Sequence, residues 1–310
     1  MTITQLEYVV AVDNHRHFAK AAEACFVTQP TLSMQIHKLE DELDILIFDR
    51  SKQPVTPTEV GKKIIAQARV VITQSKLIKQ ISQQEKGFFE GDFRIGIIPT
   101  ISPYLLHRFL SKFQKSMPHI NLIVEELQTD QIITQLKKDV LDAAILATPL
   151  EENGIIEKPV YYEPFMAYIP EGHRLSKEEF VLNSELKLND MLLLNEGHCF
   201  RNSVLNLCGQ SDENHERQFS IESGNFETLI RLADSGYGMT LLPYLAGVDM
   251  DKEGSQHIKP IAEPRPTREI SVIYRRTQLK IKLVEALIES IKSAVPKKLS
   301  QKNDNVVAPV

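Results

Sequence analysis

The pattern of apolar and polar positions divides the chain into stretches with different periods. Residues 1–57 show helical spacing, residues 58–90 hold one long helical pattern, and residues 91–295 alternate short apolar runs with amphipathic helices. The tail over residues 296–310 is polar and charged, and we expect it to be disordered. The length of 310 residues is typical of about two domains.

The first stretch predicts two helices joined by a tight turn. A short helix of small residues covers residues 18–24, and Thr28 can cap the next helix, in which Pro30 is tolerated in the first turn. The inward positions are Leu32, Ile36 and Leu39, and the outward positions are Gln29, Thr31, Ser33, Gln35 and Lys38. Short polar side chains of this kind reach base edges and phosphates in the major groove. A small helical bundle with a solvated face explains the spacing equally well.

The second stretch predicts a long linker helix. Thr56-Pro57-Thr58-Glu59 forms a capping box with proline at the first helical position. Ile64, Val71 and Ile78 then recur every seven residues, as in a coiled-coil seam. Dimerisation through residues 58–90 is one interpretation, and packing of the helix on its own domain is the other.

The third stretch opens with strands and helices in the order βαβαβ. Apolar runs at residues 93–98, 122–124 and 143–146 predict strands, and this order predicts a parallel sheet with a crevice at the carboxyl ends of its strands. Thr100 and Thr129 lie at two of these ends, beside helix N-termini that favour anions and oxygen ligands. Helix capping alone would also explain either threonine.

Two of the three cysteines, Cys199 and Cys208, lie in one short segment. His198 and Arg201 flank Cys199, and positive charge from such neighbours favours a reactive thiolate. If residues 200–208 form one helix, the two backbones lie roughly 13 Å apart, whereas a disulfide requires Cα atoms within about 7 Å. The bond therefore cannot form unless the segment unwinds. The alternative is an inert buried pair, and the spacing disfavours zinc.

Composition and charge narrow the classes of function. The net charge of −5 gives no sign of nucleic-acid binding, and residues 1–57 carry eight acids against five Lys and Arg. No run approaches the ~18 apolar residues of a membrane span. With no leader segment, we expect a cytoplasmic protein with reduced thiols, and no metal or other cofactor is predicted.

The first stretch resembles the winged helix of LysR-type transcriptional regulators. The matching motifs are Phe18-Ala19-x-Ala21-Ala22-Glu23, Val27-Thr28-Gln29-Pro30-Thr31-Leu32-Ser33, Gln35-Ile36-x-Lys38-Leu39-Glu40 and Phe48-Asp49-Arg50. The resemblance implies that residues 29–38 are the recognition helix and that Arg50 lies by the wing, near phosphate or the minor groove. The DNA-contacting residues implied in this way are Gln29, Pro30, Thr31, Ser33, Met34, His37, Lys38 and Arg50. Many family members carry arginine where Met34 stands, and a more basic wing.

The third stretch resembles the effector domain of the same family. Gly236-Tyr237-Gly238-Met239-Thr240-Leu241-Leu242-Pro243 and Gly172-His173-Arg174-Leu175 carry this similarity. It implies an α/β fold class with an N-terminal winged helix-turn-helix, a linker helix and a two-lobed regulatory domain of the type 2 periplasmic-binding-protein fold. The expected boundaries are 1–57 for DNA binding, 58–90 for the linker, 91–164 with 267–295 for lobe I, and 165–266 for lobe II.

Within that family, the two-cysteine segment is similar to the members that sense hydrogen peroxide. The resemblance implies that Cys199 is the peroxidatic thiol and Cys208 the resolving thiol. The implied peroxide pocket consists of Thr100, Thr129, His198 and Arg268, with Arg265 as the alternative to Arg268. The implied partners are double-stranded promoter DNA, hydrogen peroxide, a second copy in a homodimer or homotetramer, RNA polymerase, and glutaredoxin or thioredoxin as the reductant. No membrane partner is implied.

The resulting hypothesis is a redox-sensitive activator of oxidative-stress genes that is not an enzyme. One alternative is a LysR-type regulator that answers a small-molecule effector and keeps both cysteines as core residues. The other is a thiol peroxidase, although the chain lacks the Pro-x-x-x-Thr-x-x-Cys pattern of peroxiredoxins.

Overall fold

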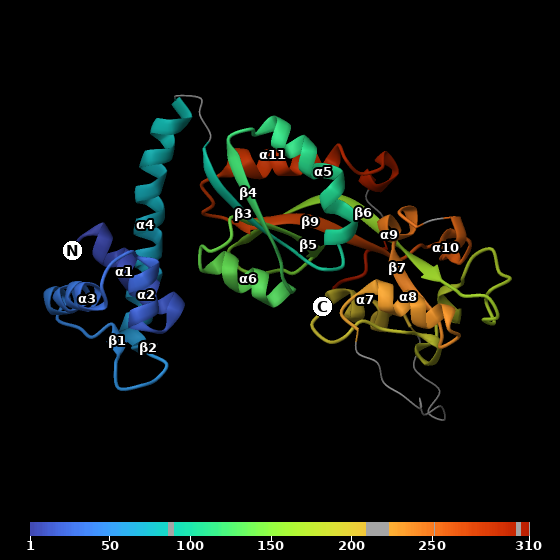
Figure 1. Cartoon of the computed structure of the whole chain (residues 1–310), viewed down its shortest axis with the longest axis horizontal. Coiled ribbons are helices and arrows are strands. Elements are labelled where there is room, and N and C mark those ends of the chain that lie inside the picture. The colour runs from blue at the N-terminus through green and yellow to red at the C-terminus, as the bar shows by residue number, and fades with distance from the viewer. Residues whose placement is uncertain (86–89, 209–222, 251, 302–304, 310) are drawn as a thin grey trace. The chain divides into compact units, whose positions relative to one another are not determined.

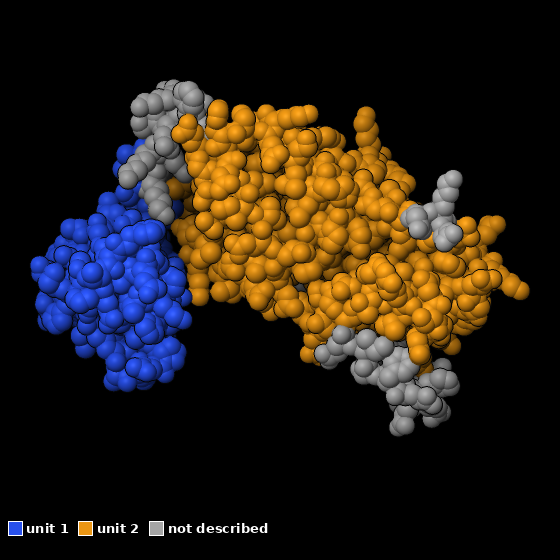
Figure 2. Space-filling model, viewed as in Figure 1, with its two compact units in different colours: residues 1–89 blue, residues 90–310 orange. Residues whose placement is uncertain are grey.

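The computed structural model describes residues 1–85, 90–208, 223–250, 252–301 and 305–309. The chain forms two compact units, residues 1–89 and 90–310, which Figure 2 colours separately. Among the described residues, none of the helices has both the length and the apolar character of a membrane span.

The first unit is a helix-turn-helix followed by a small hairpin (Figure 1). Its elements are α1 (Ile3–His15), α2 (Phe18–Ala24), α3 (Gln29–Leu43), β1 (Phe48–Asp49), β2 (Thr56–Pro57) and α4 (Glu59–Glu85). Thr28 caps α3 as predicted, because its hydroxyl accepts a hydrogen bond from the backbone N–H of Thr31. The three predicted inward residues of α3, Leu32, Ile36 and Leu39, are fully buried.

The long helix α4 starts two residues later than the capping-box pattern predicts. Thr56 and Pro57 are used in β2, where they pair antiparallel with β1. Thr58 is the residue that caps the helix, since its hydroxyl accepts from the N–H of Gly61 at 2.9 Å and donates to the carbonyl of Leu46 at 2.7 Å. Thr56 and Pro57, which local propensity assigns to the start of the helix, therefore form a strand instead.

The predicted seam of α4 divides into two parts. Ile64 and Val71 are partly buried and pack against the core of the first unit, beside the buried Ile65, as the interpretation of packing on the chain's own domain expects. Ile78 is 72% exposed and stays available to a second chain. Residues 86–89 of the predicted linker lie outside the described residues.

Lobe I of the second unit contains the predicted parallel sheet. Its first elements are β3 (Gly91–Ile97), α5 (Ser102–Ser116), β4 (Ile120–Glu126), α6 (Thr129–Lys137) and β5 (Ala143–Thr148). Strand β3 pairs in parallel with both β4 and β5. Helices α5 and α11 (Ile281–Lys292) lie on one side of this sheet and α6 lies on the other (Figure 1). The connections β3–α5–β4 and β4–α6–β5 run in opposite directions across the sheet, so right-handed crossovers place α5 and α6 on opposite faces.

Two long strands connect the lobes. Strand β6 (Ile155–Tyr168) pairs antiparallel with β9 (Thr267–Arg275) as far as Pro164, and β9 also pairs antiparallel with β5. From Phe165 onward, β6 pairs instead with β7 (Thr240–Pro243) and β8 (Ile258–Pro260). The lobe boundary thus lies where β6 changes partners. Lobe II also contains η1 (Asn183–Glu185), η2 (Leu188–Asp190), α7 (Cys199–Leu207), α8 (Phe226–Asp234), α9 (Tyr244–Val248) and α10 (Lys252–Gln256).

The described residues of the C-terminal tail, 296–301 and 305–309, contradict the expectation of disorder. Residues Lys297–Ser300 form the short helix η3, in which Leu299 is buried. Further on, Val306 pairs with Thr267 at the start of β9, and Val307 packs against the core of lobe II. A few apolar residues are enough to hold a polar tail on a folded domain that offers an apolar surface and an unpaired strand edge. The composition of the tail does not reveal these two features of the domain.

Candidate functional site

The two cysteines of lobe II lie at opposite ends of one intact helix. Helix α7 covers Cys199–Leu207, with His198 at its N-cap position and Cys208 at its C-cap position, in agreement with the predicted helix. Both cysteines are free thiols. The nine-residue separation at about 1.5 Å per residue keeps the two backbones roughly 13 Å apart, so no disulfide can form without unwinding α7.

The sulfur of Cys199 lies where the two lobes meet. The hydroxyl of Thr129, at the start of α6 in lobe I, and the backbone N–H of Phe200 both act on the sulfur in the direction that lowers the pKa of the thiol. Gly197 packs closely against Gln128 on the same side. A Cβ atom at Gly197 would lie 2.8 Å from the Gln128 amide, and its φ of +89° also favours glycine. This close contact brings the N-terminus of α7 to that of α6.

Neither candidate threonine is a helix cap, which corrects the structural explanation for both. The N-cap position of α5 is Ile101, and that of α6 is Gln128. The Thr100 hydroxyl instead accepts from Nη1 of Arg268 at 3.2 Å, while the Thr129 hydroxyl acts on Cys199 and lowers the pKa of its thiol. Both hydroxyls are therefore committed to the site between the lobes.

Arg268, and not Arg265, is the arginine of this site. Arg268 is only 3% exposed, and its Nη2 donates to the carbonyl of Thr100 at 3.1 Å. Its guanidinium carbon lies 5.2 Å from the centroid of the Phe200 ring, next to Cys199 in α7. Arg265 is directed away, toward Glu263 at 3.3 Å and the carbonyl of Ile261.

The charge around Cys199 differs from the sequence-based prediction. The sequence points to His198 and Arg201 as sources of positive charge. However, burial lowers the pKa of His198, so the imidazole is neutral at pH 7, and Arg201 donates to the carbonyl of Leu194 at 3.0 Å. Arg268 is the positive group that acts on Cys199. His198 is only 7% exposed, which the sequence motif alone does not reveal.

Both thiols are protonated in this conformation. Cys199 keeps some exposed surface, yet burial raises the pKa of its thiol, while Arg268 and the hydrogen bonds from Thr129 and Phe200 oppose the rise. Cys208 packs partly buried against the lobe II core, and burial raises its pKa to about 11. The site thus presents one partly accessible thiol among hydroxyl, amide and guanidinium donors, and a second thiol held at a distance.

Sequence reasoning missed three residues that shape this site. Glu163 is 1% exposed and its Oε2 accepts from Nε and Nη2 of Arg268 at 2.9 and 2.7 Å. Phe200 lies under the guanidinium, and Gln128 contacts Gly197. Glu163 is opposite Arg268 in the β6–β9 register, a relationship that appears only once the strands are paired.

The predicted DNA-contacting residues share one face of the first unit. Gln29, Pro30, Thr31, Met34, His37 and Lys38 are exposed on α3, and Ser33 is half-buried. Arg50 follows β1, stacks on Phe18 at 5.0 Å, and donates to Ser33 at 3.2 Å and to Glu40 at 2.8 Å. Arg50 is therefore tied to α3 through Ser33 and Glu40.

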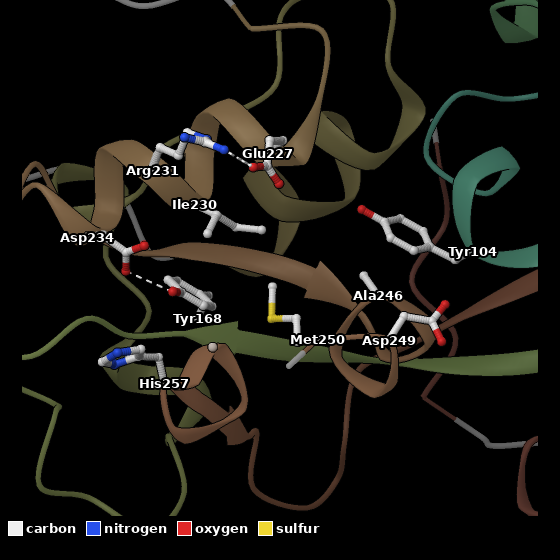
Figure 3. A pocket seen from close by; sticks show the side chains of 11 residues that line it. Tyr104, Tyr168, Glu227, Ile230, Arg231, Asp234, Ala246, Asp249, Met250 and His257 are labelled. Atoms are coloured by element: carbon white, nitrogen blue, oxygen red, sulfur yellow. Dashed lines mark hydrogen bonds and ion pairs between the residues drawn. The ribbon is translucent and has the colours of Figure 1, made fainter. Parts of the chain in front are cut away.

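A cavity with a volume of about 580 Å³ is lined by Tyr104 of lobe I and by residues of lobe II (Figure 3). Its polar groups already pair with one another, since Tyr168 donates to Asp234 at 2.8 Å and Arg231 to Glu227 at 2.9 Å. None of the described residues lining it is a cysteine. Nor does any cluster of three or more His, Cys, Asp or Glu suited to a metal ion occur in the described part of the chain.

Each of the two units matches a model of a known protein family. Residues 3–62 match the family model described as bacterial regulatory helix-turn-helix protein, lysR family, and residues 86–296 match the model described as LysR substrate binding domain. Together these matches cover nearly the whole chain. A generic helical bundle is thereby excluded for the first unit.

Individual relatives are similar over almost their full length. The chain is 36% identical over 293 residues to the DNA-binding transcriptional dual regulator OxyR of Escherichia coli K12, covering 94% of this chain and 95% of that protein. It is 37% identical over 276 residues to the hydrogen peroxide-inducible genes activator of Pectobacterium carotovorum, covering 89% and 90%.

The chain also superposes on solved structures of OxyR proteins. Full-length OxyR from Pseudomonas aeruginosa superposes with a TM-score of 0.81 at 34% identity, covering 97% of this chain and 98% of that one. OxyR from Porphyromonas gingivalis superposes with a TM-score of 0.65 at 31% identity, covering 70% of this chain and 99% of that one.

Proposed function

The chain belongs to the LysR family of bacterial transcriptional regulators, and from this premise we propose that it senses hydrogen peroxide through Cys199 and controls oxidative-stress genes. The observation that carries the proposal is the position of the Cys199 sulfur. The Thr129 hydroxyl of lobe I and the Arg268 guanidinium both act on this sulfur to lower the pKa of its thiol, and Thr100 accepts a hydrogen bond from the same guanidinium.

The first chemical step is oxidation of Cys199 by peroxide. The sulfur attacks one peroxide oxygen, the O–O bond breaks, and the departing hydroxide takes up the thiol proton and leaves as water. The product is a sulfenic acid. Thr100 and Thr129 orient the peroxide through their hydroxyls, neutral His198 hydrogen-bonds it, and Arg268 stabilises the negative charge that develops on the leaving oxygen.

The second step forms the disulfide. The Cys208 thiol attacks the sulfenic sulfur, an S–S bond forms, the S–O bond breaks and a second water leaves. Two thiols are thereby oxidised as one peroxide is reduced to two waters. Because α7 holds the sulfurs apart, the product requires α7 to unwind, which changes the lobe junction that Cys199 and Thr129 now close.

The change is read out on promoter DNA through the first unit. The face formed by Gln29, Pro30, Thr31, Ser33, Met34, His37, Lys38 and Arg50 contacts the DNA. Helix α4, with Ile78 exposed, supplies a surface for dimerisation, and two dimers give a tetramer. The regulator acts as an activator with RNA polymerase in the cytoplasm, and glutaredoxin or thioredoxin restores the thiols. It controls transcription and has no catalytic turnover of its own.

Thiol mapping after peroxide treatment tests the proposal. Wild-type protein should yield a Cys199–Cys208 disulfide, Cys208→Ser should accumulate a Cys199 sulfenic acid, and Cys25→Ser should behave as wild type. DNA footprints of the reduced and oxidised protein should differ in the wild type and be identical in Cys199→Ser. Oxidant-independent footprints that respond to a small molecule would contradict the proposal, and so would sustained peroxide turnover with thioredoxin in the absence of DNA binding.

A further inference from the structure

The arginine of the site is held by a buried carboxylate on the neighbouring strand. Glu163 of β6 and Arg268 of β9 are direct partners in the antiparallel register. Their side chains are 1% and 3% exposed. Two of the guanidinium N–H groups donate to the same oxygen of Glu163, at 2.7 and 2.9 Å.

The other oxygen of Glu163 ties the same carboxylate to lobe II. Glu163 Oε1 accepts from the backbone N–H of Leu245, at 2.8 Å, in α9. Arg268 in turn reaches Thr100 in lobe I through Nη1 and Nη2, at 3.2 and 3.1 Å. One carboxylate therefore fixes the arginine to both lobes, directly beneath the Phe200 ring that follows Cys199.

The charge balance of this arrangement is the decisive point. A buried arginine without a partner is strongly destabilising, whereas a bidentate pair with a carboxylate has no net charge. The positive charge of Arg268 beside Cys199 is therefore offset by the negative charge of Glu163. The neighbouring tyrosines cannot supply a negative charge in place of Glu163, because both phenols stay neutral. Burial raises the pKa of Tyr104 to about 12 and that of Tyr161 well above its ordinary value. His198 is neutral, and Arg108 pairs with Asp249.

We propose that Glu163 is a positioning residue for the peroxide reaction: it holds Arg268 against Thr100 and offsets its charge, so that Cys199 stays a protonated thiol until peroxide enters. Glu163 thereby sets the peroxide concentration at which the sensor responds. This inference rests on the proposed function of Cys199, although Glu163 itself touches neither the sulfur nor the peroxide.

The test is the pH dependence of Cys199 alkylation by iodoacetamide in reduced full-length protein carrying Cys25→Ser and Cys208→Ser. Glu163→Gln keeps the shape and removes the charge, so the midpoint of the profile should fall by about one pH unit and the rate at pH 7 should rise about tenfold. Arg268→Gln should move the midpoint in the opposite direction. Glu263→Gln, which removes the surface partner of Arg265, should leave the profile unchanged.

A second background keeps the test decisive if Glu163→Gln folds poorly. In Arg268→Gln protein, adding Glu163→Gln removes an unpaired carboxylate, so the double variant should fold and its midpoint should lie below that of Arg268→Gln alone. Circular dichroism and thermal unfolding verify the fold in each case. A midpoint that Glu163→Gln fails to lower in both backgrounds overturns the proposal.

Peroxide titrations separate this inference from the proposed function. With Cys208 restored, Glu163→Gln should be half-oxidised at a lower peroxide concentration than wild type. If the disulfide forms at the wild-type concentration and the alkylation midpoint is unchanged, the role of Glu163 is refuted while peroxide sensing stands. If the alkylation midpoint shifts but no variant forms the disulfide, the proposed function fails, and only the effect of Glu163 on the Cys199 thiol stands.

Discussion

The hydroxyl of Ser203, in the middle of α7, lies 3.3 Å from the carbonyl oxygen of Ala308 near the C-terminus. The same hydroxyl lies 3.3 Å from the carbonyl oxygen of Cys199, one turn earlier in the helix. Two further backbone bonds anchor this end of the chain, from Thr267 to Asn305 at 3.0 Å and from Val307 to Thr267 at 2.8 Å. The C-terminal segment thus joins the helix that carries both thiols to the strand that carries Arg268.

Deleting residues 305–310 should make α7 easier to unwind. The deletion uncovers the part of the lobe II core that Val307 packs against and removes the Ala308 carbonyl from Ser203, so we expect a loss of about 1–2 kcal/mol in the free energy of unfolding. Disulfide formation at a fixed peroxide concentration should be faster, as measured by quenched thiol mapping. Gln301→Ala, at an exposed position before the segment, is the control. Equal stability and equal oxidation rates in the deletion and the full chain would contradict this role.

Replacing Thr129 by valine should slow oxidation of Cys199. Valine has nearly the same shape, but it lacks the hydroxyl that hydrogen-bonds the sulfur, so the pKa of the Cys199 thiol should rise further. We expect about a tenfold lower rate with peroxide at pH 7, measured by stopped-flow or by thiol trapping. Thr129→Ser retains the hydroxyl and should recover most of the rate. A valine variant as fast as wild type would remove Thr129 from the site.

Acid pH should destabilise the second unit through His198. Burial holds the pKa of His198 below its ordinary value of 6.5, so the neutral imidazole is favoured in the folded state. This contribution to stability is fully present above pH 6.5 and is lost as the pH falls toward the lowered folded-state value. Denaturant unfolding between pH 7.5 and 5 should show a smaller pH dependence for His198→Gln than for wild type. His119→Gln, at an exposed position, should keep the wild-type dependence.

Glu40 should be essential for the stability of the first unit. Its carboxylate is 3% exposed, accepts from the N–H groups of Ile47 and Phe48 at 2.8 and 3.2 Å, and pairs with Arg50. Glu40→Ala leaves two buried N–H groups without this acceptor and should lower the free energy of unfolding by about 3 kcal/mol. Thermal unfolding of the full chain should show an earlier transition for this unit. Glu42→Ala, which removes an exposed ion pair, should cost less than about 1 kcal/mol.

Local patterns along the chain were sufficient to determine several elements of this protein. Helical spacing and the Thr28 cap determined α3, and the βαβαβ order determined the parallel part of the sheet. The apolar run after Cys199 determined α7, and with it the separation of the thiols. Each of these depends on residues close in sequence, through periodicity and hydrogen bonds within a few positions, which is why the sequence is a sufficient guide to them.

Tertiary packing alone decided how the site works. The pairing of Glu163 with Arg268 follows from a strand register that joins residues far apart in the sequence. Burial keeps His198 neutral, and packing of the lobes turned the two threonines from candidate caps into groups that act on Arg268 and Cys199. Val307 packs against the core of lobe II, which is built by segments far from it in the sequence. Burial, charge offset and strand register are properties of the assembled fold, so no local pattern along the chain encodes them.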